Sequence, residues 1–386
     1  MLNKLAMVAG ETSGDLLAAH LLGGMQTRWP ELAAPGAAFG IGGPNMQARG
    51  FAAQWPSEKL AVRGYVEVLK HYREIVGIRK RLAAQLSANP SKPQLFIGVD
   101  APDFNLDLEL QLKAQGIKTV QFISPAIWAW RPERIEKIKR ACNAVLCIFP
   151  FEPELYQGTG VQATYVGHPL AQAIPLEPDR SAARTQLNLP QEAPVLALLP
   201  GSRAAEVQYL VPRMFAAVSL LWRSHPSVQV LVPCVPTLRH TIAAHAAKAG
   251  LQHELGQRLH LLQGLSHAAL AACDVTLIAS GTATLEAALF KRPMVVVYNM
   301  HPISWWLTQR KRLQPWVGLP NILSNSFVVP ELLQDQATPQ AMASKLRDWF
   351  DDAPKREQTA QQFIQLHHQL KRDTVTLACD AIQAIL

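Results

Sequence analysis

The stretch LFIGVDAPDFN, residues 95–105, decides the fold class of this chain. Its first half, Leu95–Val99, is a short apolar run typical of a strand that is buried on both faces of a parallel sheet. The run ends at residues 100–103, Asp-Ala-Pro-Asp, because proline cannot continue a sheet ladder and two acids cannot share a dry strand. Open α/β sheets bind ligands at the carboxyl ends of their strands, so Asp100 is a candidate catalytic carboxylate. The same tetrapeptide is also compatible with a structural turn in which Asp103 caps the following helix.

The length and composition predict two domains with apolar cores. The chain has 386 residues, of which 49% are hydrophobic and 17% charged, with a formal net charge of +8. Domains usually have roughly 100–200 residues. The positive charge recurs in short clusters: Arg79-Lys80-Arg81, the stretch from Arg131 to Arg140, Arg310-Lys311-Arg312 and Lys371-Arg372. Such a surface suits nucleic acid, an anionic membrane or phosphorylated substrates, and the charge alone does not choose among them.

The cysteines and the apolar runs indicate the compartment. The five cysteines are odd in number and lack Cys-x-x-Cys spacing, which indicates buried thiols in a reducing compartment, not zinc ligands or a disulfide framework. The opening, MLNKLAMVAGETSGD, turns acidic too soon for a signal peptide. No run of about 20 apolar residues is present, so the sequence predicts no membrane-spanning helix.

Both halves of the chain repeat an order of strand, glycine turn and helix, which is typical of doubly wound α/β domains. In the first half, Leu5–Val8 predicts a strand, and residues 9–15, AGETSGD, follow it before a helical run. Residues 39–44, FGIGGP, predict a second glycine-rich turn. Neither turn has the spacing of a Walker A sequence or of dinucleotide-binding glycines. Residues 169–178 carry prolines and predict the linker between the domains.

The second half carries two turns suited to an anion. Val195–Leu199 predicts a strand that leads through Pro200-Gly201-Ser202-Arg203 into a helix, and Asp274–Ala279 leads through Ser280-Gly281-Thr282 into another. Backbone N–H groups at a helix N-terminus bind anions, and an arginine beside them strengthens the site. Two such turns in one domain predict a diphosphate site with its attached ribose.

Aromatic and basic residues cluster in three further segments. Trp128, Trp130 and Arg131 follow a predicted strand, where they either contact a sugar or phosphate or form the wall of the site. Residues 60–82 predict one or two basic amphipathic helices, either packed on the sheet or touching a membrane surface. Trp305-Trp306 with the nearby cluster 310–312 resembles segments found at membrane interfaces.

Six motifs together resemble those of the lipid-A-disaccharide synthase family across nearly the whole chain. They are AGETSGD (9–15), FIGVDAPDFN (96–105), SPAIWAWR (124–131), PGSRAAE (200–206), SGTATLE (280–286) and LPN (319–321). The resemblance implies a GT-B fold, that is, two Rossmann-like doubly wound α/β domains with an interdomain cleft. We place an acceptor-side domain at residues 1–170 and a donor-binding domain at 171–355. The helical segment 356–386 would pack back on the first domain or exchange in a dimer.

The same resemblance implies an inverting glycosyltransferase of Gram-negative lipid A synthesis. The donor would be UDP-2,3-diacylglucosamine and the acceptor 2,3-diacylglucosamine 1-phosphate, giving a β-1′,6-linked disaccharide 1-phosphate and UDP. It further implies no cofactor, no metal and no nucleic acid partner. A cytoplasmic protein, peripheral to the inner membrane and forming a homodimer, would fit this family.

The resemblance and the local chemistry assign roles to individual residues. A GT-A transferase would hold the diphosphate through a metal and an Asp-x-Asp triplet, which this sequence lacks. Helix N-termini and cations must then meet the charge of the leaving group. Asp100 is the expected general base, with His168 as its competitor. The donor-side candidates are Gly201, Ser202, Arg203, Glu206, Gly281, Thr282, Glu286 for the ribose, and Asn321. The acceptor-side candidates are Glu11, Ser13, Trp128 and Arg131, with Asp103 left open.

Two alternative functions remain at this point. A UDP-sugar 2-epimerase would use the same architecture, but a soluble sugar needs neither the basic helix nor the Trp305-Trp306 segment. A non-catalytic nucleotide- or lipid-binding module would leave the Asp100 loop unexplained. Product analysis with acylated UDP-sugar and acceptor separates the three functions.

Overall fold

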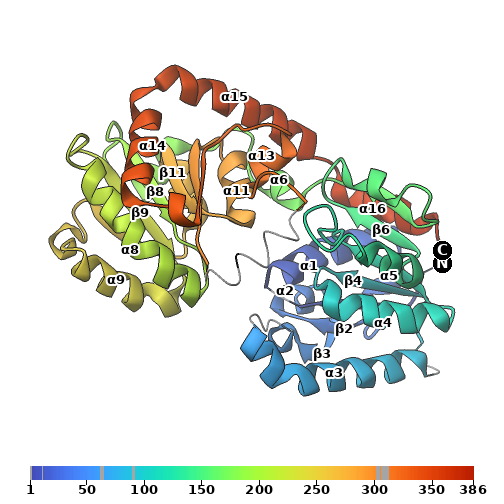
Figure 1. The fold of residues 1–386 in the computed structure, drawn as a ribbon. Coiled ribbons are helices and arrows are strands. Elements are labelled where there is room, and N and C mark those ends of the chain that lie inside the picture. Colours follow the sequence, from blue (N-terminus) through green and yellow to red (C-terminus); the bar gives the residue numbers. More distant parts are fainter. Residues whose placement is uncertain (1, 11, 61–64, 89–91, 301–304, 306–312) are drawn as a thin grey trace. The chain divides into compact units, whose positions relative to one another are not determined.

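A computed structural model describes residues 2–10, 12–60, 65–88, 92–300, 305 and 313–386. The chain divides into two units, one made of residues 1–169 with 370–386 and the other of residues 170–369 (Figure 1). The C-terminal segment expected at 356–386 is thus shared between them. Its first helix, α15 (Ala353–Leu370), lies almost entirely in the second unit, and α16 (Thr374–Gln383) lies in the first.

The first unit is built on a seven-stranded sheet in which every described pairing is parallel. The strand order is β3-β2-β1-β4-β5-β6-β7. The strands are β1 (Leu5–Ala9), β2 (Ala38–Gly42), β3 (Ala52–Pro56), β4 (Leu95–Val99), β5 (Lys118–Phe122), β6 (Ala144–Cys147) and β7 (Gln162–Tyr165). All five residues of β4 are buried, which confirms the strand predicted at this position.

The predicted glycine-rich turn at residues 39–44 is wrong, because Ala38–Gly42 forms strand β2. A side chain at Gly40 would place its Cβ 2.2 Å from the carbonyl oxygen of Met7 on the neighbouring strand β1. The glycine therefore permits a close approach of two strands, a role that local sequence does not distinguish from a turn.

Helices cover the first sheet and bury its apolar residues. They are α1 (Thr12–Arg28), α2 (Pro44–Gln47), α3 (Tyr65–Ser87), α4 (Pro102–Ala114), α5 (Arg134–Ala141) and α16. Ile78, Leu82 and Leu86 of α3 join the core formed with β1, β2 and β4, while Lys80 and Arg81 are exposed. The described part of the predicted basic helix is thus a surface helix packed on the sheet. Its residues 61–64 lie outside the described residues.

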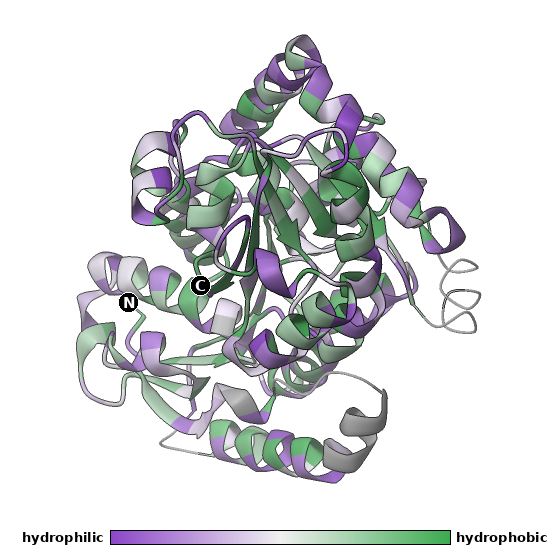
Figure 2. Cartoon of the chain, turned by 90° about the vertical axis from the view of Figure 1, so that its left-hand side faces the viewer, coloured by the Kyte–Doolittle hydropathy of each residue, from purple (hydrophilic) through white to green (hydrophobic). Residues whose placement is uncertain are grey.

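The second unit repeats the architecture with a six-stranded parallel sheet in the order β10-β9-β8-β11-β12-β13. The strands are β8 (Val195–Leu199), β9 (Gln229–Cys234), β10 (Leu259–Gln263), β11 (Val275–Ala279), β12 (Met294–Tyr298) and β13 (Glu331–Leu333). The helices are α6 (Pro169–Ala173), α7 (Arg180–Gln186), α8 (Ala204–Leu221), α9 (Arg239–Lys248), α10 (Ser266–Ala272), α11 (Thr282–Leu289), α13 (Leu319–Leu323), α14 (Pro339–Asp351) and α15. Figure 2 shows hydrophobic strands flanked by helices with hydrophilic outer residues.

The segment predicted as the linker, residues 169–178, contains a helix, α6.

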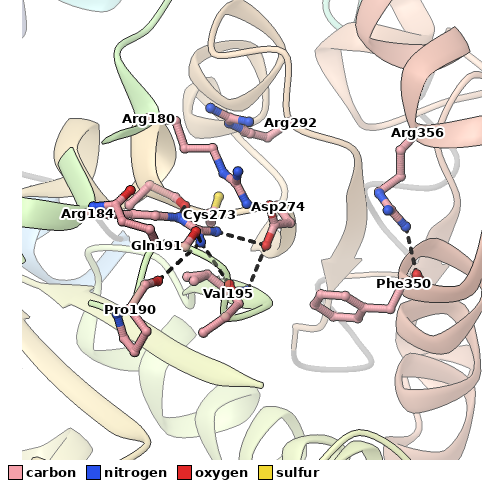
Figure 3. A network of polar contacts seen from close by, with 12 residues as sticks. Arg180, Arg184, Pro190, Gln191, Val195, Cys273, Asp274, Arg292, Phe350 and Arg356 are labelled. Atoms are coloured by element: carbon pink, nitrogen blue, oxygen red, sulfur yellow. Dashed lines mark hydrogen bonds and ion pairs between the residues drawn. The ribbon is translucent and has the colours of Figure 1, made fainter. Parts of the chain in front are cut away.

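A buried arginine ties together the amino ends of β8 and β11 (Figure 3). Arg184 is fully buried, and its guanidinium donates to the carbonyl oxygens of Ala272 (3.0 Å), Ala193 (2.9 Å), Pro190 and Gln191. It also pairs with Asp274 at 3.1 Å, and Asp274 accepts from the N–H of Val195 at 2.8 Å. All three guanidinium nitrogens thus have hydrogen-bond acceptors, and one acceptor is a carboxylate that compensates the buried charge, which is the condition for burying an arginine without a large penalty.

The contact between α1 and α16 gives a test of the C-terminal packing. A Cβ at Gly24 would lie 1.8 Å from Cγ1 of Val375, whereas a Cβ at Gly23 would lie 3.5 Å from the Arg49 guanidinium. Overpacking usually lowers the free energy of unfolding by about 1–3 kcal/mol. Where there is room for its methyl group, alanine stabilises a helix by about 1 kcal/mol relative to glycine. We expect Gly24→Ala to lower the free energy of unfolding in urea, and Gly23→Ala to leave it unchanged or raise it. Equal stability of the two variants would show that α16 does not pack against α1.

Candidate active site

The centre of the first sheet brings two distant loops together. The strand order reverses between β1 and β4, and the loops after these strands begin at Gly10 and Asp100. A Cβ at Gly10 would lie 3.3 Å from Cβ of Ala101, so the loops pack directly on each other. Ser13 is exposed in the first turn of α1, directly after this loop, and Glu11 lies outside the described residues. This is the topological switch point at which open α/β sheets bind ligands.

The backbone of Asp100 is held in an unusual conformation. Asp100 and Ala101 have φ values of 51° and 42°, a left-handed conformation that residues with a side chain rarely adopt. The N–H of Asp100 donates to the carbonyl of Phe122 at 2.9 Å. Its carbonyl oxygen accepts from the side-chain amides of Asn105 at 2.8 Å and Gln121 at 3.0 Å. The half-buried Asp100 therefore leaves the strand end from a tightly bonded backbone.

A fully buried acid, Glu109, lies behind this loop on α4. It accepts a hydrogen bond from the Cys142 thiol at 3.2 Å. Burial raises the pKa of Glu109 to about 8, and Cys142 and Lys113 offset this only in part. One oxygen each of Asn105, Glu109 and Gln121 has no hydrogen-bond partner in the described part of the chain.

The prediction that Asp103 caps α4 is wrong. The helix begins at Pro102 after Ala101, and Asp103 makes no capping hydrogen bond. Its exposed carboxylate instead forms ion pairs with Arg134 and, at 3.8 Å, with Arg131. The partners come from a segment about thirty residues further on, so tertiary packing, not local sequence, determines the contact.

Trp128 and Arg131 have different environments. The Trp128 indole N–H donates to Glu152 at 3.2 Å, and its ring meets those of Phe149 and Phe151 edge-on. Trp128 therefore belongs to an aromatic wall. Arg131 is partly exposed, and its guanidinium lies 4.3 Å from the ring centre of Trp130. A stacked, accessible guanidinium of this kind can bind a phosphate.

Glu152 is a buried acid that the sequence analysis missed. It follows β6 and accepts from the N–H groups of Ile148 and Phe149, both at 3.0 Å, as well as from Trp128. Burial raises the pKa of Glu152 to about 7. Like Asp100 it is an acid within two residues of a proline after an apolar strand, a pattern that was available in the sequence. Burial also lowers the pKa of His168, the competitor base, to about 4, so its imidazole is neutral at pH 7.

In the second unit, the loop after β8 forms the predicted glycine turn. Gly201 has a φ of 99°, and a Cβ there would lie 2.2 Å from Oε2 of Glu206. Glu206 accepts from the backbone N–H of Arg203 at 3.4 Å and from its guanidinium at 2.7 Å. Ser202 and Arg203 are exposed at the N-terminus of α8. The turn thus combines a cation with a helix N-terminus, and the carboxylate of Glu206 fills the space beside Gly201.

The loop after β11 forms a second exposed helix N-terminus. Gly281 and Thr282 are exposed at the start of α11, and nothing lies within 4 Å of a Cβ at Gly281. Glu286, one turn further on, pairs with His267 of α10 at 3.1 Å. His267 was not predicted, although it follows Gly264 at a third junction of strand, glycine and helix.

Asn321 is fully engaged within the protein. Its amide nitrogen donates to the carbonyl of Val329 and to Glu331, and its oxygen accepts from the N–H groups of Val328 and Val329. Glu331 in turn accepts from the N–H groups of residues 317 and 318. Asn321 therefore orders the segment that follows α13, while Glu331 holds the loop before it. A contact of the Asn321 side chain with a donor stays a prediction.

Among the described residues, no group of three or more His, Cys, Asp or Glu side chains could hold a metal ion. The five cysteines are free and buried.

Comparison with known proteins gives consistent results. The model of the family described as lipid-A-disaccharide synthetase matches residues 5–383. A lipid-A-disaccharide synthase of Albidiferax ferrireducens is 56% identical, covering 99% of this chain and 97% of its own. A putative UDP-N-acetylglucosamine 2-epimerase from Listeria monocytogenes has a similar structure, with a TM-score of 0.64 and 13% identity, covering 100% of this chain and 96% of its own. MurG of Acinetobacter baumannii has a TM-score of 0.56 and 14% identity, covering 99% of both chains. At such identities the two structures show the shared GT-B fold alone.

The buried Glu109 predicts a pH-dependent contribution to stability. Because its folded-state pKa is raised from 4.5 to about 8, the folded protein binds this proton more tightly than the unfolded chain. The contribution is complete below pH 4.5 and is lost as the pH rises through about 8. We expect Glu109→Gln, which does not titrate, to gain stability relative to the wild type between about pH 5 and about pH 9 in urea unfolding. Glu136→Gln removes an exposed carboxylate of α5, and its free energy of unfolding relative to the wild type should be the same at both pH values. A constant difference between Glu109→Gln and the wild type would contradict the raised pKa.

Proposed function

This chain belongs to the lipid-A-disaccharide synthase family and is a glycosyltransferase of lipid A biosynthesis, and we propose that it carries out the reaction in the following way. The 6-hydroxyl of 2,3-diacylglucosamine 1-phosphate attacks the anomeric carbon of UDP-2,3-diacylglucosamine. The bond to UDP breaks, and the α-linked donor gives a β-1′,6-linked product with inversion. The acceptor proton passes to a base, and UDP leaves as the anion.

Asp100 is the proposed general base. A primary hydroxyl is a weak nucleophile, so a carboxylate placed to accept its proton speeds the reaction. The observation that carries this assignment is the placement of Asp100 at the switch point of the first sheet, on a backbone bonded at both its N–H and its carbonyl. The pKa of His168 is lowered by burial, but that histidine lies under Phe149, with ring centres 5.6 Å apart, and is only 6% exposed. It is therefore poorly accessible to an acceptor.

The diphosphate of the donor is proposed to bind at the Gly201–Arg203 turn. Arg203 and the N–H groups at the start of α8 supply positive charge where the leaving group becomes more negative. Glu206 pairs with Arg203 at 2.7 Å, and a diphosphate would compete with this carboxylate for the guanidinium. The N-terminus of α11 at Gly281 and Thr282 is the second anion contact, and Glu286 is proposed to bind the ribose hydroxyls.

The acceptor is proposed to contact Ser13, Trp128 and Arg131, with Glu11 completing this side. In support, Ser13 is exposed in the first turn of α1, directly after the Gly10 loop that packs against the Asp100 loop. The guanidinium of Arg131 is stacked on Trp130 and only loosely paired with Asp103, at 3.8 Å. It therefore offers a charge to the phosphate of the acceptor.

We also propose that the enzyme is cytoplasmic and associates peripherally with the inner membrane. No helix among the described residues is long and apolar enough to cross a bilayer. Exposed Tyr72, Lys80 and Arg81 on α3 suit an anionic surface, and Trp305 is half-buried. Trp306 and the cluster 310–312 lie outside the described residues. A homodimer that exchanges the segment 356–386 stays a prediction, which the molar mass from light scattering checks.

The membrane proposal predicts that Lys80→Ser with Arg81→Ser weakens co-sedimentation with anionic vesicles. Each basic residue near such a surface contributes about 1 kcal/mol at modest salt. Activity on substrate in detergent micelles should be unchanged, because both side chains are exposed on α3 and neither is a candidate for substrate contact. Lys248→Ser, which removes an exposed lysine from α9 in the other unit, serves as a control for the loss of a surface charge. Undiminished binding of the double variant would exclude α3 as the contact.

The proposed base predicts that Asp100→Asn lowers turnover by at least about a hundredfold, because a positioned base contributes roughly 10²- to 10⁴-fold. Asparagine keeps the shape and loses proton affinity. UDP binding, measured by titration calorimetry, should be unchanged. Asp107→Asn on α4, which removes only ion pairs with Arg79 and Lys137, should retain normal turnover. Near-normal turnover of Asp100→Asn would remove the assignment of the base.

The proposed donor site predicts a different result for Arg203→Ala. A charge-assisted hydrogen bond contributes about 1.5–3 kcal/mol, and charge on UDP grows in the transition state. The variant should therefore lose at least about tenfold in kcat and should also bind UDP more weakly. Arg213→Ala, on the same helix α8 and bonded to the carbonyl of Tyr209, is the matched control. Normal UDP inhibition of Arg203→Ala would place the diphosphate elsewhere.

A further inference from the structure

We propose that Asn105 and Gln121 are positioning residues that set the direction of the Asp100 side chain through its main-chain carbonyl. The inference rests on the proposed function, since it concerns the geometry of the proposed base. Neither residue is assumed to touch substrate, because both side chains are completely buried.

The first observation is that the end of β4 adopts a conformation that local forces disfavour. Asp100 and Ala101 are consecutive residues with side chains, and both are left-handed. Such a conformation brings Cβ too close to the following carbonyl, so it persists only where surrounding contacts hold it. Sparsely populated backbone conformations of this kind gather at active sites.

The second observation is that two amides from different elements converge on one oxygen. Asn105 belongs to α4 and Gln121 to β5, and both donate to the carbonyl of Asp100, at 2.8 and 3.0 Å. The N–H of the same residue is bonded to Phe122 on β5. The peptide groups on either side of the Asp100 Cα are thereby fixed, and they determine where its Cβ points.

The third observation is that the two amides lower the stability of the fold, so stability does not explain why they are there. The oxygens of both amides, Asn105 Oδ1 and Gln121 Oε1, are buried without a hydrogen-bond partner in the described part of the chain. Apolar side chains of the same shape would avoid that cost. A Cβ at Gly98 would lie 2.8 Å from Cβ and Cγ of Asn105, so the strand leaves the asparagine little room to turn. Gln121 also donates to the carbonyls of Phe122 and Ile123, at 3.4 and 3.3 Å, and Asn105 to that of Val99 at 3.5 Å, but the bond to Asp100 is the shortest that either amide makes. We therefore explain the amides by the donors that they present to Asp100.

The experiment replaces Gln121 by methionine, which keeps the shape and removes the donor. We expect kcat to fall roughly 10- to 100-fold, because small misplacements of a catalytic group have effects of this size. The KM for the acceptor and the affinity for UDP should stay within about threefold of the wild type, because the binding groups are untouched. Thr119→Val removes another fully buried hydrogen bond of β5, to the carbonyl of Ala141, and should leave kcat unchanged.

The decisive measurement combines Gln121→Met with Asp100→Asn. If Gln121 acts through the Asp100 carboxylate, the double variant should be no slower than Asp100→Asn alone. An equal further loss in the Asp100→Asn background, or an unchanged kcat of Gln121→Met, would overturn the positioning role while leaving the proposed base intact. Near-normal turnover of Asp100→Asn itself would overturn the proposed base and this inference with it. Asn105→Leu takes the place of Gln121→Met in the same cycle should the latter fail to fold.

Discussion

Parallel strand pairing is the constraint on which the rest of this structure depends. Every described pairing in both sheets is parallel, so each strand must be followed by a crossover, and all strands of a sheet end at the same edge. The order of the strands reverses between β1 and β4 in one sheet and between β8 and β11 in the other. The loops that leave these four strands carry Gly10, Asp100, Gly201 and Gly281, which are far apart in the sequence.

The two edges of the second sheet differ in how their polar groups are satisfied. At the amino ends of β8 and β11, Arg184 and Asp274 bond to each other and to main-chain groups, and Asp274 also pairs with Arg180 at 2.7 Å. At the carboxyl ends, Arg203 and Thr282 are exposed on helix N-termini. A buried network with many hydrogen bonds stabilises the fold, whereas exposed donors and charges remain available to a ligand. The stabilising polar network and the candidate ligand-binding groups therefore lie at opposite ends of the same strands.

The first unit shows how acids on one sheet acquire different properties. Asp100 leaves a strand end half-buried, Asp103 is exposed and paired with arginines, and Glu109 is buried with a raised pKa. Asp15, in the first turn of α1, is buried and accepts hydrogen bonds from the N–H groups of residues 43, 45 and 46, so it caps α2. Of these acids, only Asp100 directly follows a strand at the switch point without being fully buried. This is why Asp100 is the proposed base.

The sequence by itself determined the features that depend on neighbours in the chain. The apolar run Leu95–Val99 and the turn at Gly201 were predictable, because strand periodicity and turn chemistry are local. The tertiary structure decided which groups meet. Asp103 pairs with Arg134 instead of capping its helix, and α16 packs against α1. Gly40 lies in strand β2, where it permits the close approach of β1. The tertiary structure also brought Asn105 and Gln121 to one carbonyl. Such contacts join residues that are distant in sequence, and they form only once the sheet has set the distance between them.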